Sequence, residues 1–294
     1  MTPISLDTLN AADRKTFVAA LGEVIELAPW VAEEAYAARP FAGIAALYAA
    51  MTEVVRTAPE AKVRALIEGH PDLAGKAARE GKLTADSTAE QAAAGLDRLS
   101  EEEFAAFHRL NDAYRKKFAM PFIVCVRRHG KESILREFER RLQNGAPAER
   151  AAALGEVLRI AALRLDARVT GPDRLKVHGH LSTHVLDTHG GGPAQGMAIE
   201  LCEIGVGGAR TLVRTVTNAD GRTEKPLLSG TPIPIAAYEL RFAVGAYFAS
   251  RRTPTADPPF LDIVPVRFSV AEPEGRYHVP LLVTPWSYST YRGS

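Results

Sequence analysis

Histidine is the side chain whose charge changes most easily near neutral pH, and half of the eight histidines in this chain lie in one short region. His178, His180, His184 and His189 fall in and just after the stretch HGHLSTH. His178 and His180 would share one face of a strand, which invites comparison with a metallo-amidohydrolase. Such enzymes need a large barrel and further ligands downstream, whereas only His189 and His278 follow. The sequence therefore predicts no metal site.

The other histidines have simpler interpretations when they are taken one at a time. Strand alternation places His184 with Ser182 and Leu186, away from His178 and His180, which belong to the end of a linker. A lone histidine on a strand is ordinarily a satisfied or exposed side chain. His108 and His129 have no supporting pattern around them and are predicted to be surface residues.

A second set of reactive side chains lies in the first half of the chain. His70 directly precedes Pro71, which disfavours helical backbone before it, so His70 marks the exit of a helix. Ser87 and Glu90 have capping-box spacing, which would start a helix and could also place a carboxylate there. Arg164 borders apolar helix positions, where an arginine ordinarily extends its charged end into solvent.

The elements that must position these residues differ between the two parts of the chain. Sequence rich in Ala, Glu and Arg continues to about residue 168 and has helical periodicity. Helices are predicted to begin at Pro59 and at a capping box formed by Ser100 and Glu103. A last helix is expected from about Glu149 to Arg164, and the aperiodic residues 167–179 are expected to form a linker.

The remainder of the chain alternates apolar and polar residues, which is typical of strands. In AAYELRFAVG, Tyr238, Leu240 and Phe242 fall on one face. The predicted strands are this run together with 181–187, 198–203, 211–217, 264–270 and 279–283. Turns such as Asp220-Gly221 separate them, so the pattern predicts an antiparallel sandwich.

Composition excludes several classes of partner. The 36 Lys and Arg residues balance 35 Asp and Glu, which gives a formal net charge of +1 and no reason to expect a nucleic acid or an anionic membrane. Neither a secretory signal nor a membrane span is predicted. Cys125 and Cys202 lie in apolar runs and are expected to be buried free thiols. The cytoplasm is the expected location.

The chain closes on an unusual segment, YHVPLLVTPWSYSTYRGS, from Tyr277 to Ser294. Chain ends are ordinarily polar and loose, whereas this one is apolar and carries two prolines and several aromatic residues. The segment predicts a strand that must be packed.

Taken with LSTHVLDT and TNADGR, this segment resembles the 5-hydroxyisourate hydrolases, the enzyme relatives of transthyretin, and the terminal Tyr-Arg-Gly-Ser is the most specific signature. The resemblance places the family's catalytic set on His184, Arg222, His278 and Ser294, with Tyr291 binding substrate. A guanidinium close to two histidines disfavours the imidazolium, so at least one histidine stays neutral and competent as a base. Which histidine acts as the base stays open.

The first part resembles the 2-oxo-4-hydroxy-4-carboxy-5-ureidoimidazoline (OHCU) decarboxylases through RPF, HPDLAGK, STAEQAAAGLD, LNDAYRKKFAMPFIVCVR and ILREFERRL. That resemblance implies catalytic roles for His70, Glu90 and Arg164. It implies that substrate is bound by Pro71, Ser87, Gln91, Phe122, Ile123 and Val124. In the implied mechanism His70 takes the hydroxyl proton as carbon dioxide leaves, Glu90 holds His70 and the ureido group, and Arg164 fixes the ring.

Together the resemblances imply an all-α decarboxylase domain at 1–166, the linker at 167–179 and an all-β transthyretin-like hydrolase domain at 180–294. The two activities are consecutive steps of urate degradation, leading from 5-hydroxyisourate through OHCU to (S)-allantoin without a cofactor. A homotetramer or larger assembly through the transthyretin-like domain is implied, with dimerisation of the decarboxylase domain. The alternatives are a single hydrolase with a helical scaffold and a transthyretin-like ligand-binding module.

Overall fold

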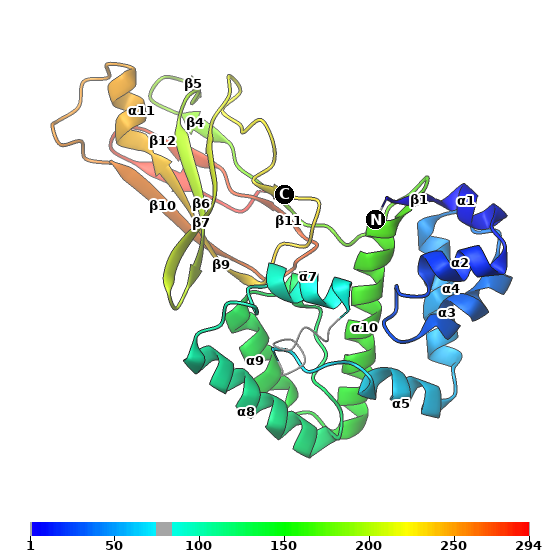
Figure 1. The fold of residues 1–294 in the computed structure, drawn as a ribbon. Coiled ribbons are helices and arrows are strands. Elements are labelled where there is room, and N and C mark those ends of the chain that lie inside the picture. The colour runs from blue at the N-terminus through cyan, green and yellow to red at the C-terminus, as the bar shows by residue number, and fades with distance from the viewer. Residues whose placement is uncertain (1, 75–83, 294) are drawn as a thin grey trace. The chain divides into compact units, whose positions relative to one another are not determined.

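The computed structural model describes residues 2–74 and 84–293 and divides the chain into two units (Figure 1). The helical unit contains Met1–Arg127 and Ser133–Val177, and the β unit contains Arg128–Glu132 and His178–Ser294. Within the described residues, no helix combines the length and apolarity needed to cross a membrane.

The helical unit is built mainly from helices. They are α1 (Leu6–Ala11), α2 (Arg14–Leu21), α3 (Pro29–Ala35), α4 (Ile44–Thr57), α5 (Glu60–Glu68), α7 (Ala85–Ala93), α8 (Glu101–Phe118), α9 (Lys131–Arg141) and α10 (Ala146–Arg168). Short 3-10 turns occur at Tyr36–Ala38 and Val126–Arg128. Two short strands, β1 (Ile4–Ser5) and β2 (Val169–Thr170), pair in parallel. In Figure 1 the green α10 runs through the middle of this unit, with α1 to α4 on one side and α8 and α9 on the other.

Local sequence determines several helix starts. The predicted capping box of α8 is confirmed, because the Ser100 hydroxyl accepts from the Glu103 amide at 3.1 Å and the Glu103 carboxylate accepts from the Ser100 amide at 2.8 Å. Pro59 is the N-cap of α5, as its position before the apolar stripe predicted. The α4 helix instead receives a cap from a distant residue: Asp173 accepts from the amides of Ile44 at 2.6 Å and Ala45 at 3.0 Å.

That distant cap belongs to the stretch expected to be a linker, and the structure corrects the expectation. Helix α10 begins earlier and ends later than predicted, and residues 169–177 fold back onto the helical unit. Leu175 is buried in the helical core, and its amide donates to the buried Asp166 carboxylate at 2.9 Å. Proline, glycine and charge indicate the absence of a regular element, but they do not exclude packing against residues far away in sequence.

The core near the end of α8 is aromatic. Phe122 stacks on Phe138 with ring centroids 3.6 Å apart, and Tyr114 meets both rings nearly edge-on. These contacts hold α8 against α9 and anchor the segment that follows α8.

The β unit contains strands in two layers and one helix. Its elements are β3 (His180–Ser182), β4 (Val185–Asp187), β5 (Gly192–Pro193), β6 (Ala198–Gly205), β7 (Gly208–Val216), β8 (Leu228–Ser229), β9 (Ala236–Ala243), α11 (Val244–Ser250), β10 (Ile263–Val270), β11 (Arg276–His278), β12 (Leu281–Val283) and β13 (Tyr288–Thr290). One sheet has the antiparallel order β10-β9-β6-β7, and the strands opposite form the orders β11-β3-β8 and β13-β12-β4-β5.

The register places apolar side chains between the layers. Leu240 lies opposite Val266 on one side and Leu201 on the other, and all three are buried. The single strand expected at 181–187 is divided into β3 and β4, which pair in parallel with β11 and β12. His180 is therefore a strand residue and not part of a linker.

Two further expectations change in this unit. His129 is buried, in a bridge with Ile235, and is not a surface residue. In the closing segment β12 is buried as predicted, but Tyr288–Thr290 of β13 is exposed in the single chain.

Candidate active sites

A cavity of about 420 Å³, its open mouth included, lies in the helical unit. Its lining includes every residue that the sequence assigned to this half. They are His70, Pro71, Ser87, Glu90, Gln91, Phe122, Ile123, Val124 and Arg164. They come from the exit of α5, from α7, from the segment after α8 and from α10, so four separate elements build one site.

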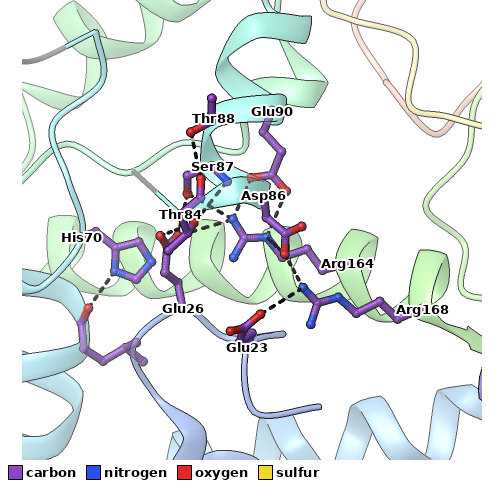
Figure 2. A network of polar contacts seen from close by, with 11 residues as sticks. Glu23, Glu26, His70, Thr84, Asp86, Ser87, Thr88, Glu90, Arg164 and Arg168 are labelled. Carbon is purple, nitrogen blue, oxygen red and sulfur yellow. Dashed lines mark hydrogen bonds and ion pairs between the residues drawn. The ribbon is translucent and has the colours of Figure 1, made fainter. Parts of the chain in front are cut away.

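The orientation of His70 is fixed by its own helix. Its amide bonds to Ile67 as the chain leaves α5, and the ring is buried. Nδ1 lies 2.7 Å from the Leu66 carbonyl, which can only accept, so Nδ1 carries the hydrogen and Nε2 is left as an acceptor (Figure 2). Burial lowers the pKa of His70, and nearby Arg164 adds to this, while the Leu66 carbonyl and Glu26 act in the opposite direction. The ring is a neutral base at neutral pH.

Arg164 and Glu90 form a bidentate ion pair at the cavity. Arg164 is 5% exposed, and its Nε and Nη2 donate to the two oxygens of Glu90 at 2.9 and 2.8 Å. Burial opposes the charge, but Glu90 and the other carboxylates nearby raise the pKa of Arg164 overall. The alternative in which this arginine extends into solvent does not hold, and Arg164 lines the cavity to which the resemblance assigned it. Glu90 is bonded to Arg164, and not to His70 as the implied mechanism required.

The capping assignment for α7 also needs correction. The N-cap is Thr84, whose hydroxyl accepts from the Ser87 amide at 3.3 Å, so Ser87 lies inside the helix. The Ser87 side chain points to the cavity and donates to Glu26 at 2.7 Å. Capping-box spacing was satisfied by coincidence, because Thr84 offers an equivalent hydroxyl three residues earlier.

Glu26 is an acidic residue of the cavity lining that the sequence did not single out. It lies in the turn between α2 and α3 and accepts from Thr84 and Ser87 hydroxyls, each at 2.7 Å, and from Arg164 Nη2 at 3.4 Å. Burial raises the pKa of Glu26, but these donors outweigh it and hold the pKa below its usual value. The sequence signal that could have identified Glu26 is that it is a single acidic residue inside the otherwise apolar run from Val24 to Ala28.

The Phe122 to Val124 segment lines the cavity. Its conformation is held from behind, because the Ile123 carbonyl accepts from Arg141 Nη1 at 2.6 Å. Next along the chain, the Cys125 amide donates to Glu156 at 2.9 Å. Opposite, the Gln91 side chain accepts from the Ala74 amide at 3.2 Å.

A second constellation lies in the β unit. The backbone of His184 forms an isolated β-bridge with that of Arg222, which follows the Asp220-Gly221 turn. The backbone of His278, at the end of β11, forms another with that of Gly293. The Ser182 hydroxyl lies 3.0 Å from His278 Nδ1, a contact that the sequence did not predict. The sequence did contain a signal for this contact, because Ser182 lies two residues before His184 in the motif LSTHVLDT.

The charge environment of these histidines is set by Arg222. Burial lowers the pKa of His184 and of His278, and the neighbouring guanidinium lowers both further. Both rings are therefore neutral at neutral pH, each with one acceptor nitrogen and one N–H donor. Tyr291 is 58% exposed, and Ser294 lies outside the described residues.

The closing Tyr-Arg-Gly-Ser requires glycine for a steric reason. A Cβ added at Gly293 would lie 2.7 Å from His278 Cδ2, closer than real contacts allow. The Gly293 amide also donates to the His278 carbonyl at 2.8 Å. A glycine therefore lets the end of the chain lie directly against this histidine.

Comparison with known proteins assigns both units. A family model described as OHCU decarboxylase matches residues 10–166, and one described as HIUase/Transthyretin family matches residues 181–293. A 2-oxo-4-hydroxy-4-carboxy-5-ureidoimidazoline decarboxylase of Halalkalicoccus jeotgali is 40% identical over 166 residues, 56% of this chain and 92% of that protein. A 5-hydroxyisourate hydrolase of Deinococcus radiodurans is 52% identical over 118 residues, 40% of this chain and 98% of that protein. The chain belongs to both families.

A crystal structure of (S)-allantoin synthase matches almost the whole of this two-family chain. It is 35% identical, covers 99% of this chain and 100% of the other, and gives a TM-score of 0.53. The predicted fold, an all-α OHCU decarboxylase domain followed by an all-β transthyretin-like domain, is thus confirmed. Within residues 2–74 and 84–293, no group of three or more His, Cys, Asp or Glu side chains is arranged to hold a metal ion.

Proposed function

We propose that this chain is a bifunctional enzyme of urate degradation. The HIUase/transthyretin domain hydrolyses 5-hydroxyisourate to OHCU, and the OHCU decarboxylase domain converts OHCU to (S)-allantoin and carbon dioxide. Membership in both families, and a match along the whole chain to an (S)-allantoin synthase, support the pairing.

The observation that carries the decarboxylase assignment is the cavity around His70. It gathers one neutral imidazole with a free acceptor, one buried arginine and two carboxylates. An imidazole held on its Nδ1 side and open on Nε2 is suited to take one proton from a substrate hydroxyl. The domain limits of 1–166 and 180–294 are also proposals, since the helical unit extends to Val177.

In the proposed decarboxylation, the bond between the ring carbon and the carboxylate breaks, and its electron pair moves into the neighbouring ring imine. His70 Nε2 takes the hydroxyl proton, so the C–OH becomes the product carbonyl. Protons then add to the imine nitrogen and to the adjacent carbon that carries the ureido group. One of these protons is the one His70 took, and the other comes from solvent, which balances the loss of carbon dioxide from the anion.

Arg164 and Glu90 act together as a positioning unit in this proposal. Two parallel hydrogen bonds fix the guanidinium plane against α7, so substrate meets a rigid wall on that side. A ring fixed against one wall receives its proton on one face, which yields a single enantiomer. Ser87, Gln91 and the Phe122 to Val124 segment complete the binding surface.

In the hydrolase, we propose that His184, Arg222 and His278 open the ring amide with water. One neutral histidine removes a proton from water as the water oxygen bonds to the amide carbon, and Arg222 stabilises the developing oxyanion. As the C–N bond breaks, that proton passes to the leaving nitrogen through the pair of histidines. Ser294 and Tyr291 complete the site. Ser182 holds His278 by its Nδ1 side.

We also propose a homotetramer or larger assembly through the transthyretin-like domain, together with dimerisation of the decarboxylase domain. Trp286, Tyr288 and Tyr291 are about half exposed in the single chain, a concentration of aromatic surface that suits an interface. Two buried thiols without a disulfide suit the reducing cytoplasm that we propose as the location.

The test is to supply urate and a urate oxidase and to follow the optical activity of the product. The proposal requires that wild-type protein, without added metal or coenzyme, forms (S)-allantoin faster than buffer. His278→Asn should slow the loss of 5-hydroxyisourate, and Arg164→Gln should slow decarboxylation or lower enantiomeric purity. Hydrolysis without decarboxylation would favour a hydrolase with a helical scaffold, and tight binding without turnover a ligand-binding module.

A further inference from the structure

Glu26 is a fixed and buried carboxylate at the wall of the decarboxylase cavity. Its side chain is 8% exposed, and both oxygens are held by donors from other elements (Figure 2). Leu27, directly after it, has a φ of 60°, a left-handed conformation that leucine rarely adopts. The turn between α2 and α3 is therefore held in an uncommon shape at the point where Glu26 enters the cavity.

We propose that Glu26 is a positioning residue of the decarboxylase site, whose negative charge stabilises His70 in the protonated form that follows removal of the substrate hydroxyl proton. This inference rests on the proposed decarboxylase function. Glu26 exchanges no proton in the step: the substrate O–H bond breaks, the Nε2–H bond forms, and the carboxylate stays ionised throughout.

The charges facing His70 single out Glu26 for this role. Among the lining residues within 2–74 and 84–293, the turn before α3 contributes Glu26, α7 contributes Glu90 and α10 contributes Arg164, whereas the segment after α8 contributes no charge. Glu90 is engaged by two hydrogen bonds to Arg164, so these two charges compensate each other. Glu26 has one long contact with the same cation, at 3.4 Å, so among the lining residues that the structure describes it is the excess negative charge.

Glu26 also determines how Ser87 can bind substrate. A carboxylate oxygen only accepts, so the hydrogen of the Ser87 hydroxyl is donated to Glu26 at 2.7 Å. The Ser87 oxygen accepts from Arg164 Nη2 at 3.3 Å, and its second lone pair remains for the cavity, where it suits an N–H group. A ureide presents several such N–H groups, so Glu26 makes Ser87 selective for a donor on the substrate.

The experiment measures kcat/KM for decarboxylation against pH in wild type, Glu26→Gln and Glu23→Gln. The acid limb of this profile reports the protonation of His70 in the free enzyme. Removal of the negative charge should move the limb to lower pH and reduce the plateau about tenfold or more. Glu23 lies in the same turn, but its side chain is 83% exposed, and Glu23→Gln should match wild type.

The outcomes separate the two proposals. A wild-type protein that does not decarboxylate OHCU refutes the proposed function itself. If wild type is active and Glu26→Gln loses rate while its acid limb stays in place, Glu26 is merely structural and the inference is wrong. Hydrolysis of 5-hydroxyisourate by the same sample measures the amount of active chain independently.

A second variant covers the case in which Glu26→Gln does not fold. Glu26→Asp keeps the charge but places it one methylene farther from Ser87. The inference requires an acid limb close to that of wild type together with a raised KM. A shifted limb, or an unchanged KM, would contradict it.

Discussion

The buried pair of Arg141 and Glu149 allows a quantitative prediction. Both side chains are essentially inaccessible to solvent, at 1% and 0% exposure. Arg141 Nε donates to Glu149 at 2.7 Å, Asn144 donates to the other oxygen at 2.7 Å, and the Tyr114 hydroxyl donates as well. Burial and then the Glu149 carboxylate raise the pKa of Tyr114, which keeps its hydroxyl a donor. Glu149→Gln is the perturbation.

Its cost follows from the donors that converge on this carboxylate. An amide offers one oxygen in place of two, and its NH2 group must face a donor. The Arg141 charge also loses its counter-ion in the core. Removing one partner of a buried ion pair costs about 3–5 kcal/mol, a large share of the roughly 5–15 kcal/mol that stabilises a domain.

The assay is urea unfolding of the helical unit. The chain has two tryptophans, Trp30 in α3 and Trp286 in the β unit, so a Trp286→Phe background makes fluorescence report on the helical unit alone. A loss of about 4 kcal/mol lowers the midpoint by about 2 M for a slope of about 2 kcal/mol per M. Glu139→Gln, an exposed change on α9, should stay within about 0.5 kcal/mol of wild type.

The same substitution tests the link from core to cavity. Arg141 also holds the Ile123 carbonyl, so a displaced guanidinium should release the cavity wall. Below its unfolding transition, Glu149→Gln should decarboxylate more slowly while hydrolysing 5-hydroxyisourate at the wild-type rate. A midpoint within about 0.5 M of wild type would refute the energetic reasoning, and unimpaired decarboxylation would refute the link.

Two further predictions concern single groups. Burial and the Arg222 guanidinium both lower the pKa values of His184 and His278. Arg222→Gln should therefore raise these pKa values and move the acid limb of hydrolysis to higher pH, because the neutral histidines are lost sooner on acidification. An acid limb that stays in place would show that the guanidinium does not affect the two pKa values. Ser100→Ala removes the α8 cap and should cost about 1 kcal/mol in the Trp30 assay, whereas Ser100→Asp, which keeps an acceptor, should stay close to wild type. Equal losses in both Ser100 variants would contradict the capping argument.

Local signals predicted the elements well wherever the cause of an element is itself local. The α8 capping box, the start of α5 at Pro59 and the alternation in β9 all depend on neighbours within a few residues. The same reasoning failed where a distant group intervened. Asp173 caps α4 from far along the chain, and residues expected to form a linker were packed for that reason.

The resemblance brought the right residues to one cavity but did not give their pairing. His70, Glu90 and Arg164 all line it, as expected of a common site. Motifs identify positions and do not state which side chain reaches which. Glu90 was expected on His70, but its two oxygens fit the planar fork of Arg164, a geometry that a single imidazole nitrogen cannot offer.

Glu26 shows why a charge balance reveals what a motif does not. Seen in sequence, an acid between Ile25 and Leu27 is one polar residue in an apolar run. Folded, it adds a second carboxylate beside Glu90 and Arg164, so the part of the lining that the structure describes carries one negative charge in excess. A buried charge is costly unless something uses it or holds it. The Thr84 and Ser87 hydroxyls donate hydrogen bonds to the Glu26 carboxylate. In the proposed reaction His70 becomes a cation, and the negative charge of Glu26 stabilises it.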